Sequence, residues 1–385
     1  MDNPPTTSMV MRRTNRALAG LFMLLLWLPM LDSIFHFDWT ASRSENRRMA
    51  EWPEFPKSWH GLQDYTGGLE AYYNDHFGCR KCLVQWHNKL KWSLFREKTA
   101  GLRPLPGQDG WLYYNECDMV DHYTGELQFT PERLHDWQVL LEKRRDWLAK
   151  RGIKYLFVVA PDKHTIYPEY LPDWIKKVRP HTKLDQFIAY MREHSTVPVL
   201  DVRDVVLAAK KNHPVYMRTD THWNDIGGFV AYQKLVESMA QQLPALKLEP
   251  LPLASFDLTN RLMPGGDLAT LLGLSMTESN AWFLIPKPGL PSFTITQPPA
   301  EHPTEPVFST NVLTQGRLII FRDSFAIAWT PFLGYHFNRI TYLWQYNLDT
   351  AWIERDKPDI VVTEMVERLF NIDDPKKMLA KEALN

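Results

Sequence analysis

Short apolar runs alternate with helix-like segments along most of the chain. Tyr155–Ala160 carries no charged residue, as is typical of a strand buried on both faces of a sheet. The segment from Thr130 instead repeats large apolar residues at spacings of three and four, and its Thr-Pro beginning and Gly152 are typical helix boundaries. Strands alternating with helices predict an α/β domain whose mostly parallel sheet is covered on both faces.

The same criteria predict the other elements. Strands are expected at Trp111–Tyr114, Val197–Val202, Arg317–Phe321, Ile340–Trp344 and Ile360–Thr363, and helices at about 67–95, 183–194, 225–241 and 376–384. No internal repeat interrupts this order, so one large domain from about residue 40 is the economical interpretation.

The N-terminus differs from the rest. Arg12, Arg13 and Arg16 precede Ala17–Leu31, which is uncharged, and scattered apolar residues continue it to Phe37. A basic region before an apolar run is typical of a secretory signal or an uncleaved signal anchor. Because no small-residue cleavage site follows, we expect a basic cytoplasmic region at 1–16, a membrane anchor at 17–37 and the large folded domain at 40–385 outside the cytoplasm. A cleaved signal and a buried core helix are the alternatives.

The amino-acid composition excludes only a few classes of function. The 385 residues include 44 Lys and Arg against 45 Asp and Glu, so the formal net charge is −1. This balance argues against a nucleic-acid partner, and 44% hydrophobic residues argue against disorder. Three Cys are too few for a disulfide scaffold; Cys79, Cys82 and Cys117 favour a disulfide outside the cytoplasm over thiol catalysis, with the pairing left open.

One candidate for chemistry follows the predicted strand at 317–321. Ser324 stands after Arg322 and Asp323, and a helix-compatible stretch begins directly behind it. A Ser on a sharp strand-to-helix turn presents its hydroxyl at the sheet edge, where the N–H groups that follow it can stabilise an oxyanion. An ordinary helix N-cap is the alternative interpretation.

A second candidate is Asp220 with His222. A nucleophilic Ser needs a general base with a near-neutral pKa, and the base needs a carboxylate to orient it. A tight turn would place the carboxylate of Asp220 on the imidazole of His222; a capping Asp beside a surface His is the alternative. Asp-x-His also offers two metal ligands, but no third stands at companion spacing, so we expect no metal.

Together these segments resemble the alginate O-acetyltransferase family of SGNH-hydrolase-like proteins. The resemblance rests on the order Asp-x-His before Asp-Ser-Phe, which is permuted relative to ordinary SGNH hydrolases. Further short motifs match: Ser44–Arg47, Asn74–Phe77 with Arg80, Gly110–Leu112, Pro161–Lys163 with Tyr167-Pro168, and Gly265–Leu268. It implies an SGNH-hydrolase-like three-layer fold behind the N-terminal anchor.

The resemblance implies that Ser324 is the nucleophile, His222 the base and Asp220 the orienting carboxylate of an extracytoplasmic polysaccharide O-acetyltransferase. Arg322, Lys163 and Trp223 are candidates for substrate or oxyanion contacts, although a solvated loop Lys and a core Trp are the plainer interpretations. Trp329 is a further candidate for stacking on a sugar.

The implied partners are a polysaccharide acceptor, a membrane-bound O-acyltransferase that supplies acetyl groups, and the inner membrane, with the catalytic domain in the periplasm. No cofactor is expected, since no CoA-binding motif is visible. A carbohydrate O-acetyl esterase with the same triad and a non-catalytic polysaccharide-binding or assembly protein are the alternatives.

Overall fold

The computed structural model describes residues 14–20, 22–23, 27, 32, 50, 52–53, 55, 62–76, 104–296, 304–382 and 384. Most of the anchor expected at 17–37 lies outside these residues, as do Cys79 and Cys82 and the motif at 44–47. Among the described residues no helix has both the length and the apolar character needed to cross a bilayer.

The chain divides into two compact units, residues 1–99 with 270–274 and residues 100–269 with 275–385. In the first, α2 (Leu62–His76) covers the beginning of the helix expected at about 67–95, and the rest of that expected helix lies outside the described residues. Trp52 packs edge-on against Tyr72 of α2, with ring centroids 5.0 Å apart.

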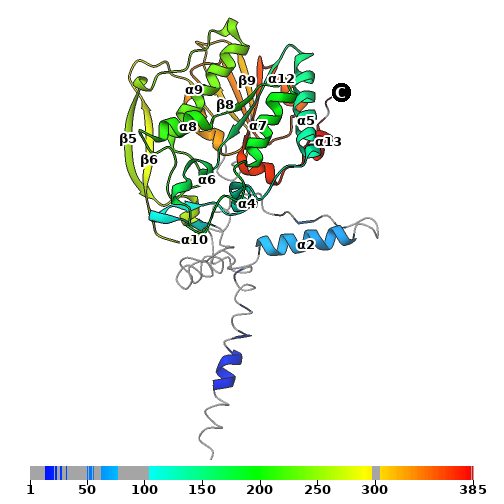
Figure 1. Cartoon of the computed structure of the whole chain (residues 1–385), viewed down its shortest axis with the longest axis vertical. Helices are drawn as coiled ribbons and strands as arrows, with labels where there is room; N and C mark the ends of the chain where they lie inside the picture. The colour runs from blue at the N-terminus through cyan, green and yellow to red at the C-terminus, as the bar shows by residue number, and fades with distance from the viewer. Residues whose placement is uncertain are drawn as a thin grey trace, which may run out of the picture. The chain divides into compact units, whose positions relative to one another are not determined.

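The second unit contains the predicted α/β fold (Figure 1). Its strands are β1 (Leu105–Pro106), β2 (Leu112–Tyr113), β3 (Lys154–Ala160), β4 (Val199–Asp201), β5 (Phe256–Pro264), β6 (Thr277–Pro286), β7 (Thr294–Ile295), β8 (Val307–Thr310), β9 (Arg317–Arg322), β10 (Arg339–Trp344) and β11 (Ile360–Val366). Its α-helices are α4 (Met119–Thr124), α5 (Pro131–Ala149), α6 (Lys163–Ile166), α7 (Lys183–His194), α8 (Arg203–Lys210), α9 (Asp225–Gln242), α11 (Thr330–Leu333), α12 (Thr350–Asp356) and α13 (Pro375–Lys381), while α10 (Asp267–Leu272) runs across the boundary between the units. Two 3₁₀ turns matter for the site, η7 (Phe325–Trp329) and η8 (Glu367–Asn371).

The main sheet has the order β4-β3-β11-β9-β10-β8-β7. Strands β4, β3, β11, β9 and β10 are parallel, whereas β8 and β7 join antiparallel at the edge. The sheet is therefore mixed, which corrects the expectation of a mostly parallel one. That expectation was formed from continuous apolar runs, and β8, whose residues alternate between buried and more exposed, has none.

The sheet separates two cores, so the fold has three layers. Successive residues of β3 point to opposite faces: Leu156 and Val158 pack with Phe229 of α9, while Phe157 packs with Trp137 of α5 and Phe187 of α7. In Figure 1, α8 and α9 accordingly lie on one side of the strands and α5 and α7 on the other. This layering leaves the carboxyl edge of the parallel strands free for loops.

Two further pairs of strands lie outside the main sheet. Strands β5 and β6 pair antiparallel in a separate ribbon, and β1 pairs with β2 in a short hairpin.

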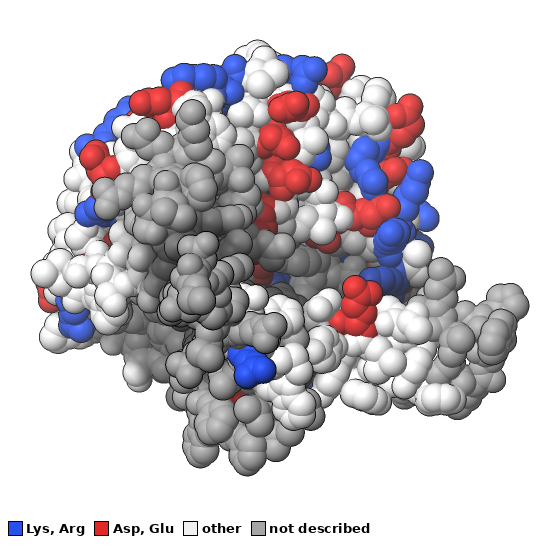
Figure 2. All heavy atoms as spheres, turned by 90° about the horizontal axis from the view of Figure 1, so that it is seen from below, with Lys and Arg blue, Asp and Glu red and all other residues white. Residues whose placement is uncertain are grey.

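Figure 2 shows acidic and basic side chains interspersed over the face that it draws, in keeping with the net charge of −1.

Candidate active site

Ser324 lies at the carboxyl end of a central strand. Strand β9 pairs with β11 on one side and β10 on the other, and its last residue is Arg322. Ser324 follows two residues later and directly precedes η7, a 3₁₀ turn rather than the α-helix that the sequence suggested. A parallel strand followed by a sharp turn places the Ser hydroxyl at the edge where the loops of the fold converge.

His222 reaches Ser324 from a loop more than 100 residues earlier in the chain. An isolated bridge between Tyr216 and Trp223 closes this loop, and Asn224 caps α9 immediately after it. The Oγ of Ser324 lies 2.7 Å from Nε2 of His222, so the hydroxyl can donate its hydrogen to the imidazole. This contact joins the two segments that the sequence analysis singled out.

Asp220 completes the chain of contacts. Its Oδ1 lies 2.7 Å from Nδ1 of His222 and also accepts the backbone N–H of His222 at 3.0 Å. Because Nδ1–H donates to Asp220, Nε2 carries the lone pair that faces Ser324. The structure thus brings Ser324, His222 and Asp220 into the arrangement of a nucleophile, a base and an orienting carboxylate.

Two acidic residues that the sequence analysis did not assign hold the Asp220 loop. Asp267 donates its N–H to Oδ2 of Asp220 (3.0 Å) and accepts the N–H of Thr221 (2.7 Å). Buried Glu278 accepts the N–H groups of Arg218 (3.0 Å) and Thr219 (2.7 Å). Asp267 lies in a motif quoted for the family resemblance, which was a signal for it, whereas Glu278 had no signal in the sequence.

The site holds His222 in a strongly acidic environment. Burial opposes protonation of His222, but the hydrogen bond to Asp220 and the charges of Asp220 and Asp267 outweigh it and raise the pKa of His222, while Arg368 opposes them. Burial alone would raise the pKa of Asp220, yet its bonds to His222 and to backbone N–H groups lower it to about 2. His222 therefore accepts a proton more readily than an ordinary histidine.

The donor set also tests the metal interpretation. One ligand atom from each of Asp220, His222 and Asp267 lies within 4.8 Å of the others, so the third ligand missing from the sequence argument is present in Asp267. Both ring nitrogens of His222 are engaged, however, and Asp220 and Asp267 each accept backbone N–H bonds. The geometry fits a hydrogen-bonded proton relay better than a cation site.

Asp323 braces the turn rather than orienting the base. It accepts the N–H groups of Phe325 and Val366, both at 2.8 Å, and the hydroxyl of Tyr346 at 3.2 Å. The N–H of Phe325 is thereby occupied, which corrects the expectation that the N–H groups following Ser324 would stabilise an oxyanion. The N–H of Ser324 itself has no hydrogen-bond partner among the described residues.

The structure places Arg322, Trp223 and Trp329, three of the four predicted substrate contacts, behind the site rather than in it. Arg322 is buried, donates to the carbonyl of Asp323 and stacks over Trp344. Trp223 is buried and donates to the carbonyl of Phe325, so its face is not presented to a sugar, and Trp329 is fully buried.

The position of Lys163 differs from both interpretations made from the sequence, a substrate or oxyanion contact and a solvated loop lysine. It is neither a solvated loop residue nor exposed to substrate: only 3% of it is exposed, and its Nζ donates to the carbonyls of Leu112 (2.8 Å) and Arg218 (3.3 Å). Burial lowers the pKa of Lys163 to about 8. The lysine therefore fastens strand β2 to the loop that carries Asp220.

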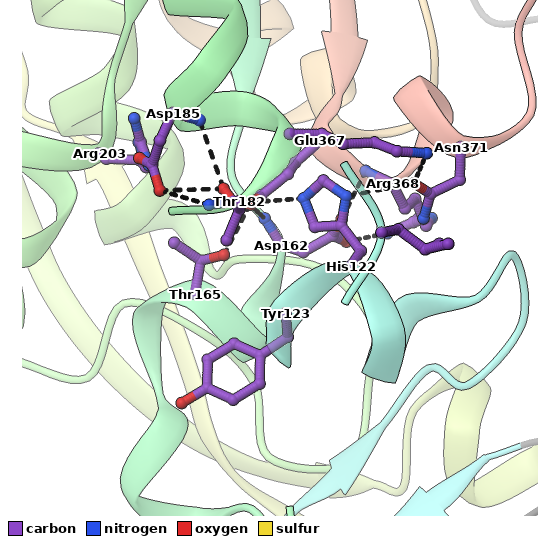
Figure 3. Close-up of polar contacts among 12 residues, drawn as sticks. His122, Tyr123, Asp162, Thr165, Thr182, Asp185, Arg203, Glu367, Arg368 and Asn371 are labelled. Atoms are coloured by element: carbon purple, nitrogen blue, oxygen red, sulfur yellow. Dashed lines mark hydrogen bonds and ion pairs between the residues drawn. The ribbon is translucent and has the colours of Figure 1, made fainter. Parts of the chain in front are cut away.

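A second polar network lies at the same sheet edge (Figure 3). Buried Glu367 bonds His122 (3.0 Å) and accepts the N–H of Asp162 (3.0 Å), and Asp162 in turn pairs with Arg368. The Arg368 guanidinium lies over the ring of Phe325, with 5.3 Å between its Cζ and the ring centroid. This network supports η7 from the side of β3 and β11. Of the four residues named, only Asp162 had a signal in the sequence, because it lies in the motif Pro161–Lys163 quoted for the family resemblance.

Comparison with known proteins agrees with this architecture. Residues 105–315 match the family model described as "SGNH hydrolase-like domain, acetyltransferase AlgX", a span that includes Asp220, His222 and Asp267 and ends before Ser324. The probable alginate O-acetylase AlgJ of Pseudomonas syringae is 31% identical over 224 residues, 58% of this chain and 54% of the relative. Its counterpart in Pseudomonas putida is 30% identical over 223 residues, 57% of this chain and 53% of the relative. The chain thus spans about half the length of the curated relatives it matches.

Solved structures share the fold at low sequence identity. Bacillus cereus PatB1 with a sulfonyl adduct is 18% identical, with a TM-score of 0.53 over 72% of this chain and 99% of that one. A DHHW family protein from Eubacterium siraeum is 16% identical, with a TM-score of 0.50 over 74% of this chain and 100% of that one. The family match covers more than half of the chain and confirms the resemblance drawn from its motifs: the protein belongs to the family of the SGNH hydrolase-like domain of acetyltransferase AlgX.

Proposed function

We propose that this protein is a polysaccharide O-acetyltransferase that carries the acetyl group on Ser324. The observation that carries the proposal is the unbroken chain of contacts from Ser324 Oγ through His222 to Asp220, with 2.7 Å at each step. The family model is named for an acetyltransferase, and the matched relatives are named as probable alginate O-acetylases, which favours acyl transfer as the chemistry of this triad.

The first half-reaction loads the enzyme. His222 Nε2 takes the hydroxyl proton of Ser324 while Oγ bonds to the acetyl carbonyl carbon of the donor. The leaving group of the donor then departs with that proton, and Ser324 is left as its acetyl ester. Asp220 stabilises the imidazolium that exists between these steps, and we assign the N–H of Ser324 as a donor to the developing oxyanion.

The second half-reaction transfers the acetyl group to the acceptor. His222 removes a proton from a sugar hydroxyl, and the sugar oxygen bonds to the acetyl carbon of the ester. The bond between that carbon and Ser324 Oγ breaks, and Oγ recovers the proton from Nε2. Every step uses groups of this chain, and water in place of the sugar would give hydrolysis instead.

The acceptor, donor and location complete the proposal. We propose an extracytoplasmic polysaccharide as acceptor and a membrane-bound O-acyltransferase as the source of acetyl groups. The catalytic domain at 40–385 would work in the periplasm, held at the inner membrane by the anchor at 17–37 behind the basic region at 1–16. The supports for this location are Arg12, Arg13 and Arg16 and the uncharged run from Ala17 to Leu31.

The test uses the full-length chain in detergent with 4-nitrophenyl acetate as donor. We expect the wild type to release nitrophenol, to show an acetylated Ser324 by mass spectrometry, and to acetylate an added oligosaccharide. Ser324→Ala should lower the rate by a factor of about 10³ or more, because the nucleophile is lost.

The outcomes separate the rival functions. Release that depends on Ser324 and yields only acetate, with uronate and neutral oligosaccharides alike, would identify a carbohydrate O-acetyl esterase. Equal rates for Ser324→Ala and wild type would contradict the triad, and binding of the oligosaccharide without turnover would then favour a polysaccharide-binding protein.

A further inference from the structure

We propose that Asp267 is a positioning residue of the reaction, a second carboxylate that acts on His222 alongside Asp220. The inference rests on the proposed acyl transfer and adds a fourth residue to the relay. It is carried by the hydrogen bonds that place Asp267 and by its distance to the imidazole.

Reciprocal bonds hold the carboxylate of Asp267 against the Asp220 loop. The N–H of Asp267 donates to Oδ2 of Asp220 at 3.0 Å, and Oδ1 of Asp267 accepts the N–H of Thr221 at 2.7 Å. Gly266 makes this approach possible, because a Cβ there would lie 2.4 Å from the Cβ of Asp220. The two segments are therefore fitted to each other at the backbone.

This arrangement leaves the second carboxylate oxygen of Asp267 facing the base. Its Oδ2 lies 3.9 Å from Nδ1 of His222, beyond hydrogen-bond distance but close enough for a strong electrostatic interaction, and the side chain is 23% exposed. His222 thus has two carboxylates near Nδ1: Asp220, which accepts its hydrogen, and Asp267, which contributes charge.

The chemical consequence differs between the resting enzyme and the reacting one. With His222 neutral, Asp220 and Asp267 repel each other, and burial together with this repulsion raises the pKa of Asp267. When His222 takes the proton of Ser324, the imidazolium relieves that repulsion. The attraction between Asp267 and the imidazolium is therefore stronger in the transition state than in the ground state, and such an interaction lowers the barrier.

Other charged groups face the same site and oppose the two carboxylates. Arg368 lowers the pKa of His222, and Lys163 lies close enough for its own pKa to respond to Asp220, Asp267 and Glu278. Glu278 braces the same loop through Arg218 and Thr219 but is not among the principal causes of the pKa shift of His222, so it provides a control for loop support with a smaller charge effect.

The experiment compares wild type, Asp267→Asn and Glu278→Gln across pH with 4-nitrophenyl acetate. Asp267→Asn preserves the shape and the Oδ1 acceptor for Thr221 while removing the charge. We expect the acidic limb of its pH–rate profile to move to lower pH by about one unit, and its plateau rate to fall about tenfold. Glu278→Gln should lower the melting temperature and leave the position of the limb unchanged.

A measurement without turnover keeps the inference separate from the proposed function. In a Ser324→Ala background, NMR titration of the His222 ring should show its midpoint moving to lower pH on Asp267→Asn. The same comparison is made in a Ser324→Ala, Asp220→Asn background, where adding Asp267→Asn should lower the midpoint of the His222 titration further. Because two backgrounds are compared, the conclusion does not depend on the stability of one variant.

Each result bears on one claim. An unmoved acidic limb and an unmoved His222 titration in folded Asp267→Asn would reduce Asp267 to a loop brace and overturn the inference. An inactive wild type that still shows the NMR shift would sink the acyl-transfer proposal and leave the coupling of Asp267 to His222 standing.

Discussion

At the scale of single residues, His222 owes its chemistry to the atoms around it. Its two ring nitrogens have separate partners, Ser324 at Nε2 and Asp220 at Nδ1, so the tautomer that can act as a base is selected by hydrogen bonds. Its 21% exposed side chain leaves it within reach of solvent and substrate. The surrounding carboxylates then decide the pH at which it works.

The pH dependence of activity follows from this environment. His222 must be neutral to accept the Ser324 proton, and its pKa is raised above the ordinary 6.5 despite burial, by Asp220 first and Asp267 second. Activity should therefore be lost as pH falls through the raised pKa, with a half-maximal point above 6.5. A pH–rate profile of the full-length chain measures this; a limb centred below 6.5 would show that the charges of Asp220 and Asp267 do not reach the base.

At the scale of secondary-structure elements, the helix that follows His222 fixes its position. Asn224 accepts the N–H groups of Ile226 and Gly227 at the start of α9 and donates to the carbonyls of Pro214 and Asn280. One side chain thus ties the end of the His222 loop to α9, to the segment before the loop and to β6. Such a cap contributes to stability and to geometry at once.

Asn224→Ala tests this double role. We expect the free energy of unfolding to fall by about 1–2 kcal/mol, since two helix N–H groups and two carbonyls lose their partner. We also expect kcat to fall about tenfold, because a small displacement of the base weakens its alignment with Ser324. Urea unfolding and steady-state rates measure the two effects.

Asp349→Ala is the matched control for this variant. Asp349 caps α12 through the N–H groups of Ala351 and Trp352, as Asn224 caps α9. It should lower stability by a similar amount and leave kcat near that of the wild type. Equal losses of kcat in both variants would mean that Asn224 acts through stability alone.

At the scale of the whole molecule, a buried ion pair fastens the end of the chain to the α5 layer. Arg144 of α5 and Glu382 are both fully buried, and Glu382 also accepts the N–H of Leu348 at 3.0 Å. Arg144 in turn donates to the carbonyl of Tyr346. Removing one charge from such a pair leaves the other without compensation in a low-dielectric interior.

Glu382→Gln should therefore lower the free energy of unfolding by about 3–5 kcal/mol. The exposed pair of Arg151 with Glu354, whose side chains are 32% and 57% exposed, gives the comparison: Glu354→Gln should cost less than about 1 kcal/mol. Urea unfolding of both variants measures the difference. Similar small losses for the two would argue that Glu382 is not held in the interior.

Much of the fold was predictable because its signals are local. The apolar runs at β3, β9 and β11 and the periodicity of α5, α7 and α9 were readable within windows of a few residues, and their boundaries agree closely with the structure. The β5–β6 ribbon was missed because much of it is exposed, so that it carries no buried run. The antiparallel strands β8 and β7 at the edge of the sheet were missed because strand pairing depends on partners far along the chain.

Three features could be predicted from local sequence, because each depends on neighbouring residues: the strand-to-turn placement of Ser324, the Asp-x-His turn and the family motifs. Long-range packing, in contrast, brings the N–H of Asp267 to Asp220, 47 residues away, and brings Glu278 to the same loop. The same packing buries Lys163, Arg322 and Trp223, so that they support the site from behind instead of facing a substrate. Burial and long-range hydrogen bonds arise when distant segments pack together, and no local pattern of residue types records which segments will meet.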